Sequence, residues 1–212
     1  MTVALLSFAV AAAVLIVLPG PDTTVVLRAI AGGGRGAATR TAVGVCCGLV
    51  VWLVVAVAGL SALLAASRTG YEVLKIVGAL YLGWLGARTL WSLRRRPASP
   101  EGAEPDPAPS RRRFPRSGFA LGLATDVLNP KVGVFFVTFL PQFIPHHAPV
   151  TAYTLLLGAL YIVGTAAWFA LLVRLAARLG RWLRRPAPQR WMQRVTGVAL
   201  LGFAVGMVAE SA

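Results

Sequence analysis

Charged side chains are scarce in this sequence, and acidic ones are the scarcest. Of 212 residues, 13% are charged, with 7 Asp and Glu against 21 Lys and Arg, whereas a soluble domain carries about 25% charged residues. Only two cysteines occur, which excludes a disulfide scaffold, and as neighbours (Cys46 and Cys47) they lack the spacing of zinc ligands. Hydrophobic residues reach 57% and come in long blocks. This composition is typical of a protein with several membrane spans.

Signatures of catalysis and of nucleotide binding are also missing. The sequence has no His-Glu-x-x-His, and its Ser, Cys and His residues suggest no nucleophile–base constellation. The glycine-rich stretch 32–36 lacks the Lys-Ser/Thr ending of a phosphate loop, so it predicts a hinge or a plain loop. His146 and His147 fall in a predicted outer loop without other ligands nearby. We therefore expect no enzyme activity, no cofactor and no metal site.

Six stretches are apolar and long enough to cross a hydrocarbon core about 30 Å thick. They cover residues 3–30, 41–65, 74–93, 118–140, 151–173 and 191–208, and the first and fourth are interrupted. No segment between them is long enough for a separate domain. The sequence thus predicts a single all-α integral membrane domain over 1–212 with six transmembrane helices.

The arginines predict how these helices are oriented. Basic residues concentrate in cytoplasmic loops, and here they follow the first, third and fifth spans, whereas the second loop has only Arg68 and the fourth has none. Both termini are therefore predicted to lie outside. The charge then reflects topology and attraction to anionic lipids rather than nucleic-acid binding, for which no module is present. The arginines of the three basic loops are Arg35 and Arg40; Arg94, Arg95, Arg96, Arg111, Arg112, Arg113 and Arg116; and Arg174, Arg178, Arg181, Arg184, Arg185, Arg190 and Arg194.

A proline- and arginine-rich segment divides the chain into two halves. Residues 1–93 and 118–212 each hold three predicted spans, and residues 94–117 read as a cytoplasmic linker without apolar periodicity. Because three is odd, the second half enters the membrane from the opposite side. The sequence therefore predicts two inverted three-helix repeats.

Both halves begin with a helix that proline interrupts. The first break is Leu18-Pro19-Gly20-Pro21-Asp22, and the second runs from Asp126 to Lys131 through Asn129-Pro130. A helix climbs about 17–24 Å before each break, which places it within the hydrocarbon region. Backbone groups freed there are tolerated only where protein or a water-filled cavity satisfies them. Paired breaks of this kind are the best sequence pointer to the central site of a transporter.

The residues around the breaks suit a zwitterionic ligand. Asn129-Pro130 predicts an N-cap with proline at the first helical position, and Gly20-Pro21 is a weaker version. The freed helix starts and Lys131 would bind a carboxylate, while Asp22 and Asp126 would face an amine or carry a coupling proton. The alternative is structural, with Asp22 or Asp126 paired to Lys131 and proline only bending the span. Thr23, Thr24 and Thr125 are the neighbouring polar residues.

These motifs resemble the LysE/RhtB family of bacterial amino-acid exporters. The resemblance rests on Pro19-Gly20-Pro21, on the segment 75–86 (KIVGALYLGWLG), on Gly118-Phe119 with Asn129-Pro130-Lys131, and on Leu140-Pro141-Gln142-Phe143, in this order over nearly the whole chain. It implies a multi-pass protein of the bacterial cytoplasmic membrane that exports amino acids by the membrane potential or a proton gradient. The Arg- and Pro-rich linker departs from the pattern but touches none of these motifs.

Weaker signals remain open to two interpretations. Lys75 has a functional interpretation, as a charge that takes part in coupling or gating of transport. In the structural interpretation its side chain extends to the outer membrane–water interface or pairs with Glu72. Gln142 lines an external gate or is an ordinary interfacial amide. Glycine pairs spaced by four predict close helix contacts within the chain or in a homodimer, namely Gly44/Gly48, Gly118/Gly122 and Gly202/Gly206.

The sequence thus favours a secondary transporter that exports amino acids or related small zwitterions. Two alternatives stay open. A metal-cation exporter would use the carboxylates but should bring more Cys, His or Met into its spans. A non-transporting scaffold or a lipid-processing protein would explain the spans but not the paired breaks.

Overall fold

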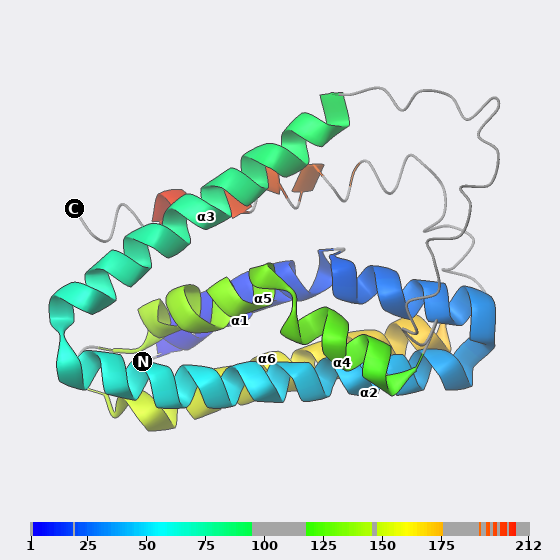
Figure 1. The fold of residues 1–212 in the computed structure, drawn as a ribbon, viewed down its shortest axis with the longest axis horizontal. Coiled ribbons are helices and arrows are strands. Elements are labelled where there is room, and N and C mark those ends of the chain that lie inside the picture. Colours follow the sequence, from blue (N-terminus) through cyan, green and yellow to red (C-terminus); the bar gives the residue numbers. More distant parts are fainter. Residues whose placement is uncertain are drawn as a thin grey trace.

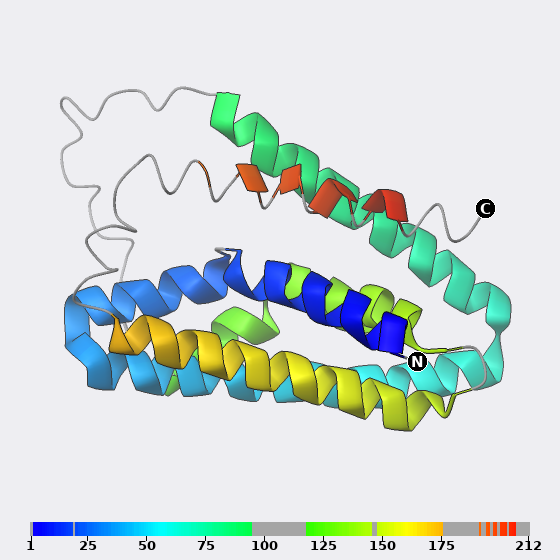
Figure 2. The same ribbon diagram turned by 180° about the vertical axis from the view of Figure 1, so that it is seen from behind.

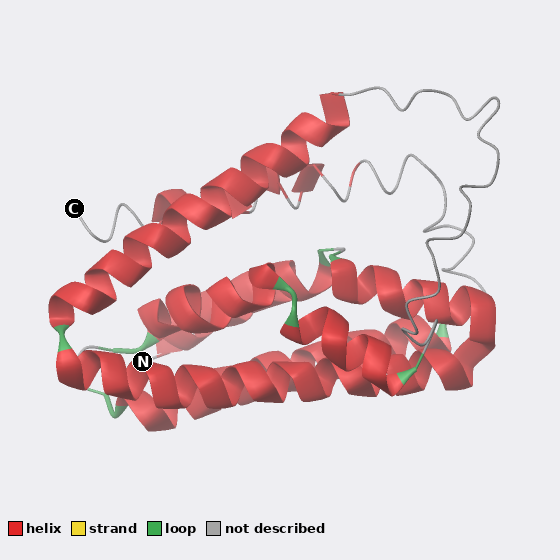
Figure 3. Cartoon of the chain, in the orientation of Figure 1, coloured by secondary structure: helices red, strands yellow, loops and turns green. Residues whose placement is uncertain are grey.

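A computed structural model describes residues 2–18, 20–94, 118–145 and 148–175, together with short stretches between 191 and 206. Within these residues every regular element is a helix and no strand occurs (Figure 3), which confirms the predicted all-α class there. The elements are α1 (Thr2–Val17), α2 (Pro21–Ala66), α3 (Arg68–Arg94), α4 (Phe119–Val127), α5 (Pro130–Val134), the π-helical turn η1 (Phe135–Phe139), the 3-10 turn η2 (Leu140–Phe143) and α6 (Val150–Arg174).

The outer surface of these helices is apolar. Large hydrophobic side chains are widely exposed, among them Leu6 (68%), Val54 (61%) and Val163 (67%). Among the described residues, three helices are long and apolar enough to cross a membrane: Pro21–Gly59, Glu72–Trp91 and Val150–Arg174. The bent pair Phe119–Val127 and Pro130–Phe143 would form a fourth. A lipid environment removes the cost of such a surface, so the chain is an integral membrane protein.

The first two predicted spans are joined by a sharp kink at one residue rather than by a loop. Helix α2 covers both the end of predicted span 3–30 and all of predicted span 41–65. Its one non-helical residue is Gly34, with φ 69° and ψ −165°, a backbone conformation open essentially to glycine alone. Figures 1 and 2 show α2 turning back on itself between its dark-blue and cyan parts. The glycine-rich stretch is therefore a hinge, and the expected loop around Arg35 and Arg40 is mostly helical.

The other predicted spans are described to different extents. The fifth, 151–173, matches α6, and the third, 74–93, begins six residues earlier than expected, at Arg68 of α3. The fourth, 118–140, is broken as predicted, and its two parts meet at 54°. The linker beyond Arg94, the His146–His147 pair and most of the span 191–208 lie outside the described residues, so the six-span inverted arrangement stays a prediction.

Close approach between α2 and α4 is made possible by glycines. A Cβ atom at Gly44 would fall on the carbonyl oxygen of Phe119, and one at Gly122 would fall on that of Thr41. The two helices lie side by side in Figure 1. This confirms the predicted helix contact for Gly44 and Gly122. Gly202 and Gly206, by contrast, are exposed, and a Cβ atom added at either would meet nothing within 4 Å, so they make no such contact within the described residues.

The main core lies where α1, α2, α3, α6 and the segment from α5 to η2 meet. Phe135 of η1 stacks against Tyr161 of α6 with ring centroids 4.4 Å apart, and it also faces Phe8 of α1 at 6.3 Å. Leu49 and Leu157 are fully enclosed in the same cluster. This core holds the two proline breaks against each other.

Alanine at Gly44 or at Gly122 should destabilise the protein. Each added methyl group must push apart two backbones in contact, which costs about 1–3 kcal/mol. We expect a lower thermal unfolding midpoint in detergent for both variants. Gly202→Ala is the control because its methyl group would meet open space. An equal midpoint for Gly44→Ala and Gly202→Ala would show that the α2–α4 contact is not tight.

Candidate functional site

The first break separates α1 from α2. Helix α1 ends at Val17 and α2 begins at Pro21. The carbonyl of Gly20 accepts hydrogen bonds from the backbone N–H of Thr24 at 3.0 Å and from its hydroxyl at 2.9 Å. Asp22 and Thr23 thus lie in the first turn of α2, where Thr23 is buried. Pro19 itself lies outside the described residues.

The second break separates α4 from α5 and is capped as predicted. The Asn129 side-chain oxygen accepts a hydrogen bond from the Lys131 backbone N–H at 3.1 Å, and Pro130 occupies the first helical turn. An asparagine cap is worth about 0.5–2 kcal/mol relative to alanine. It fixes the point at which the helix restarts.

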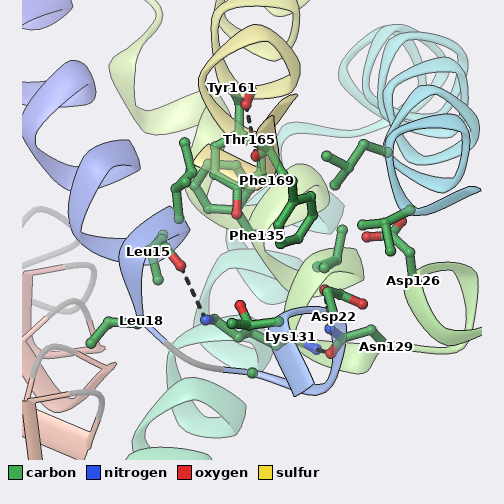
Figure 4. A pocket seen from close by; sticks show the side chains of 16 residues that line it. Leu15, Leu18, Asp22, Asp126, Asn129, Lys131, Phe135, Tyr161, Thr165 and Phe169 are labelled. Atoms are coloured by element: carbon green, nitrogen blue, oxygen red, sulfur yellow. Dashed lines mark hydrogen bonds between the residues drawn. The ribbon is translucent and has the colours of Figure 1, made fainter. Parts of the chain in front are cut away.

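The fold brings the two breaks together. Asn129 donates a hydrogen bond from its amide nitrogen to Oδ2 of Asp22, over 2.8 Å and across 107 residues of sequence. The Lys131 ammonium donates to the Leu15 carbonyl oxygen in a long contact of 3.4 Å. Figure 4 shows Asp22, Asn129 and Lys131 gathered at one side of the site. Polar groups from both halves therefore form a single cluster.

A small cavity lies at this meeting point. Its volume is about 30 Å³, which is room for about two water molecules and far below the about 300 Å³ of a typical small-molecule site. The described conformation is therefore closed around the cluster. The polar part of the lining is Asp22, Thr23, Asp126, Asn129, Lys131, Tyr161 and Thr165, and the apolar part is Leu15, Ile16, Leu18, Gly20, Val45, Leu49, Val132, Phe135 and Phe169.

Asp126 is the most unusual residue of the lining. Its side chain has no exposed surface, and neither carboxyl oxygen has a hydrogen-bond partner among the residues that the structure describes. Oδ1 of Asp22 is likewise unpaired. Because a buried, unpartnered carboxylate is costly, Asp126 calls for a proton or a positively charged group. Asp126 is therefore not bonded to Lys131 in this conformation, whereas the other forms of the structural alternative, in which Asp22 pairs with Lys131 or one of the carboxylates caps a helix, stay open.

Other predicted site residues lie elsewhere. The Thr24 and Thr125 hydroxyls donate to carbonyls of their own chain segments, at Gly20 and Leu121. Gln142 donates to the Thr138 carbonyl and lines a separate groove with Ser7 and Phe143, away from the central cavity. Lys75 belongs to α3, and its side chain is not among those that the structure describes.

Helix α6 adds residues that no sequence motif singled out. Tyr161, Thr165 and Phe169 follow one another at spacings of four, so they share one helix face, and all three line the cavity. The signal was present, since Tyr161 and Thr165 are polar groups inside an apolar span. Among the described residues, no three His, Cys, Asp or Glu side chains come together to hold a metal ion.

Comparison with known proteins identifies the family. A family model described as LysE type translocator matches residues 13–211. The chain belongs to the LysE family. Its members are translocators, so this protein is a transporter and not an enzyme. No solved structure matches the chain.

Named relatives of this LysE-family chain include efflux proteins. The leucine efflux protein of Enterobacter sp. (strain 638) is 34% identical over 155 residues, which cover 72% of this chain and 69% of that protein. The threonine efflux protein of Escherichia coli (strain K12) is 28% identical and covers 90% of both chains. The uncharacterized membrane protein YrhP of Bacillus subtilis (strain 168) is 29% identical over 95% of this chain and 96% of its own.

Replacement of Asn129 by alanine should loosen the junction between the breaks. The change removes the cap of α5 and the hydrogen bond to Asp22, so we expect a loss of about 1–3 kcal/mol of stability and a lower thermal unfolding midpoint. Thr125→Val is a matched control, because the Thr125 hydroxyl bonds only within its own helix. If both variants unfold at the same temperature, the Asn129 contacts do not hold the site together.

Proposed function

We propose that this chain is a secondary transporter that exports amino acids or closely related zwitterions across the bacterial cytoplasmic membrane. The observation that carries this proposal is the closed cavity at the junction of two broken helices, lined by two carboxylates and an ammonium. Paired helix breaks at membrane depth are the usual place of a transporter's substrate site. The efflux names of the relatives support amino acids as the substrate class.

The charged groups suit the two ends of an amino acid. The Lys131 ammonium makes only a long contact with the Leu15 carbonyl, and a substrate carboxylate would offer it a stronger, charge-assisted bond. The substrate ammonium would bind near Asp22 and Asp126, whose unpaired oxygens need a cationic partner. The apolar part of the lining would contact the substrate side chain.

Transport would proceed by alternating access. The cavity is too small for an amino acid in the described conformation, so the site must widen toward one side of the membrane and then toward the other. We propose that two inverted three-helix halves, in a six-span arrangement, move around the breaks to do so. Both termini would lie outside, with anionic lipids bound at the cytoplasmic arginines.

One contact supports this orientation. The Arg35 guanidinium donates to the Arg174 carbonyl at 3.1 Å, so the hinge of α2 and the end of α6 lie at the same end of the bundle. These are two of the three arginine-rich regions, and the positive-inside rule places both in the cytoplasm. Whether the exposed Gly202 and Gly206 meet a second copy in a homodimer stays a prediction.

Exchange in proteoliposomes tests the substrate class. Vesicles preloaded with a mixture of amino acids, with each labelled compound followed separately, should show accelerated exchange of one or a few of them. Asn129→Ala should slow that exchange at least tenfold, because it removes both the cap of α5 and the hydrogen bond to Asp22 that joins the two breaks. If the folded protein exchanges no amino acid, the proposal is overturned. A metal-cation exporter and a non-transporting membrane protein would then be the alternatives to test.

Proton coupling is tested at the two carboxylates. We propose that Asp22 or Asp126 carries a proton while the site is closed, since an unpartnered buried carboxylate needs one. Asp126→Asn and Asp22→Asn should each be compared with the parent chain under an imposed pH gradient at zero membrane potential. The variant of the coupling residue should lose its response to the gradient, measured relative to the exchange that it retains at equal pH. A full response in both variants would remove the carboxylates from coupling.

A further inference from the structure

Each proline break takes helical donors away from backbone carbonyls, among them the Leu15 carbonyl at the first break and the Asp126 carbonyl at the second. In an α-helix the N–H of a residue donates to the carbonyl four residues earlier, and proline has no N–H. By sequence, Pro19 cannot donate to Leu15, and Pro130 cannot donate to Asp126. Inside a membrane no bulk water replaces the missing donor, so these carbonyls need another one.

In the structure each of these carbonyls is bonded by a side chain from the other half. The Leu15 carbonyl accepts from the ammonium of Lys131, which belongs to the second half, at 3.4 Å. The Asp126 carbonyl accepts from the indole N–H of Trp52, which belongs to the first half, at 3.2 Å. It also accepts from the Asn129 backbone N–H at 2.9 Å, which closes the last turn of α4. Each of the two carbonyls thus accepts a hydrogen bond from a side chain of the other half, and the Asp126 carbonyl has a backbone donor as well.

Glycines on α5 and on α2 leave the space that the Trp52 ring and Asp126 occupy. A Cβ atom at Gly133 would lie 2.6 Å from Cη2 of Trp52. On α2, Gly48 lies one turn before Trp52 on the same helix face, and a Cβ atom there would lie 2.5 Å from Oδ2 of Asp126. One face of α2 therefore contacts Asp126 twice, at the carboxyl group through Gly48 and at the carbonyl through Trp52.

We propose that Trp52 is a positioning residue for Asp126. Its indole N–H takes the place of the amide that Pro130 lacks, holds the end of α4 against α2, and so keeps the Asp126 carboxyl at the cavity. Together with the Lys131–Leu15 hydrogen bond, the Trp52–Asp126 hydrogen bond holds the two breaks in contact, with one donor from each half. The step from the position of Asp126 to transport rests on the proposed function, whereas the hydrogen-bond role of Trp52 does not.

A double-mutant cycle between Trp52 and Pro130 tests the replacement of the amide. Trp52→Phe removes the indole N–H and keeps an aromatic ring. Pro130→Ala supplies a backbone N–H that can donate to the Asp126 carbonyl once Asn129 turns from its extended conformation to a helical one. In the parent chain, Trp52→Phe should slow exchange by about three- to tenfold, as expected for the loss of one buried hydrogen bond, and lower the unfolding midpoint by about 2–4 °C. With Pro130→Ala already present, the same change should have little further effect on the midpoint.

Trp168→Phe is the matched control for the lost nitrogen. The indole nitrogen of Trp168 is buried on α6 and has no hydrogen-bond partner, so its removal should alter neither the midpoint nor the exchange rate. Two outcomes would overturn the proposal. In the first, the decreases in the unfolding midpoint caused by Trp52→Phe and Pro130→Ala are additive. In the second, Trp168→Phe lowers the midpoint and the exchange rate as much as Trp52→Phe does. If Pro130→Ala does not fold, Gly133→Ala takes its place. Gly133→Ala should displace the Trp52 ring and lower the midpoint and the exchange rate as Trp52→Phe does. Its control is Gly59→Ala, whose methyl group meets open space. Equal midpoints and exchange rates for these two alanine variants would also overturn the proposal.

The pH dependence of exchange separates this inference from the proposed function. If Trp52 positions a proton-carrying Asp126, Trp52→Phe should shift the pH of half-maximal exchange, and Trp168→Phe should not. Coupling between Trp52 and Pro130 in the midpoint, with an unchanged pH profile, would keep the positioning role of Trp52. The same result would contradict the assignment of the coupling proton to Asp126.

Discussion

The need to satisfy backbone carbonyls away from water is the constraint on which this structure depends. Proline at 19 and at 130 ends two helices inside apolar spans and removes two helical donors. In the fold the two breaks lie side by side. There Lys131 donates a hydrogen bond to the Leu15 carbonyl and Trp52 donates one to the Asp126 carbonyl, each from the other half of the chain. The same juxtaposition assembles the charged cavity, because polar residues lie on one or both sides of each proline break.

Glycine makes this arrangement possible by letting helices approach closely. At Gly44 and Gly122 the backbones of α2 and α4 touch without an intervening side chain, and at Gly48 the Asp126 side chain lies against the backbone of α2. The short distance between the helices is what encloses Asp126 completely and excludes a partner for its carboxyl oxygens. Close packing and an unpaired buried acid therefore have one origin, which links the stability of the bundle to the chemistry of the site.

The small volume of the cavity is the reason for the proposed movement of the site. Its room for about two waters leaves the carboxylates and the ammonium with weak or missing contacts. Binding of a zwitterion would satisfy these groups but needs a wider site. Polar groups that are poorly satisfied when the site is closed favour opening, while the aromatic packing around Phe135 and Tyr161 favours closure. A transporter needs these two tendencies to be nearly balanced.

Local chemistry made several features readable from the sequence, and others depended on packing between distant segments. Composition predicted a helical membrane protein, proline placed both breaks, and Asn129 was recognised as a cap, because each effect acts within a few residues. A hinge was one of the two predictions for the glycine-rich stretch and is found at Gly34, but the helix on both sides of it was missed, since glycine permits a turn and does not require a loop. The Asn129–Asp22 bond, the isolation of Asp126 from Lys131, the cavity face of α6 and the role of Trp52 could not be predicted. They join residues far apart in the chain, and contacts of that kind are set by how whole helices pack, which no local pattern encodes.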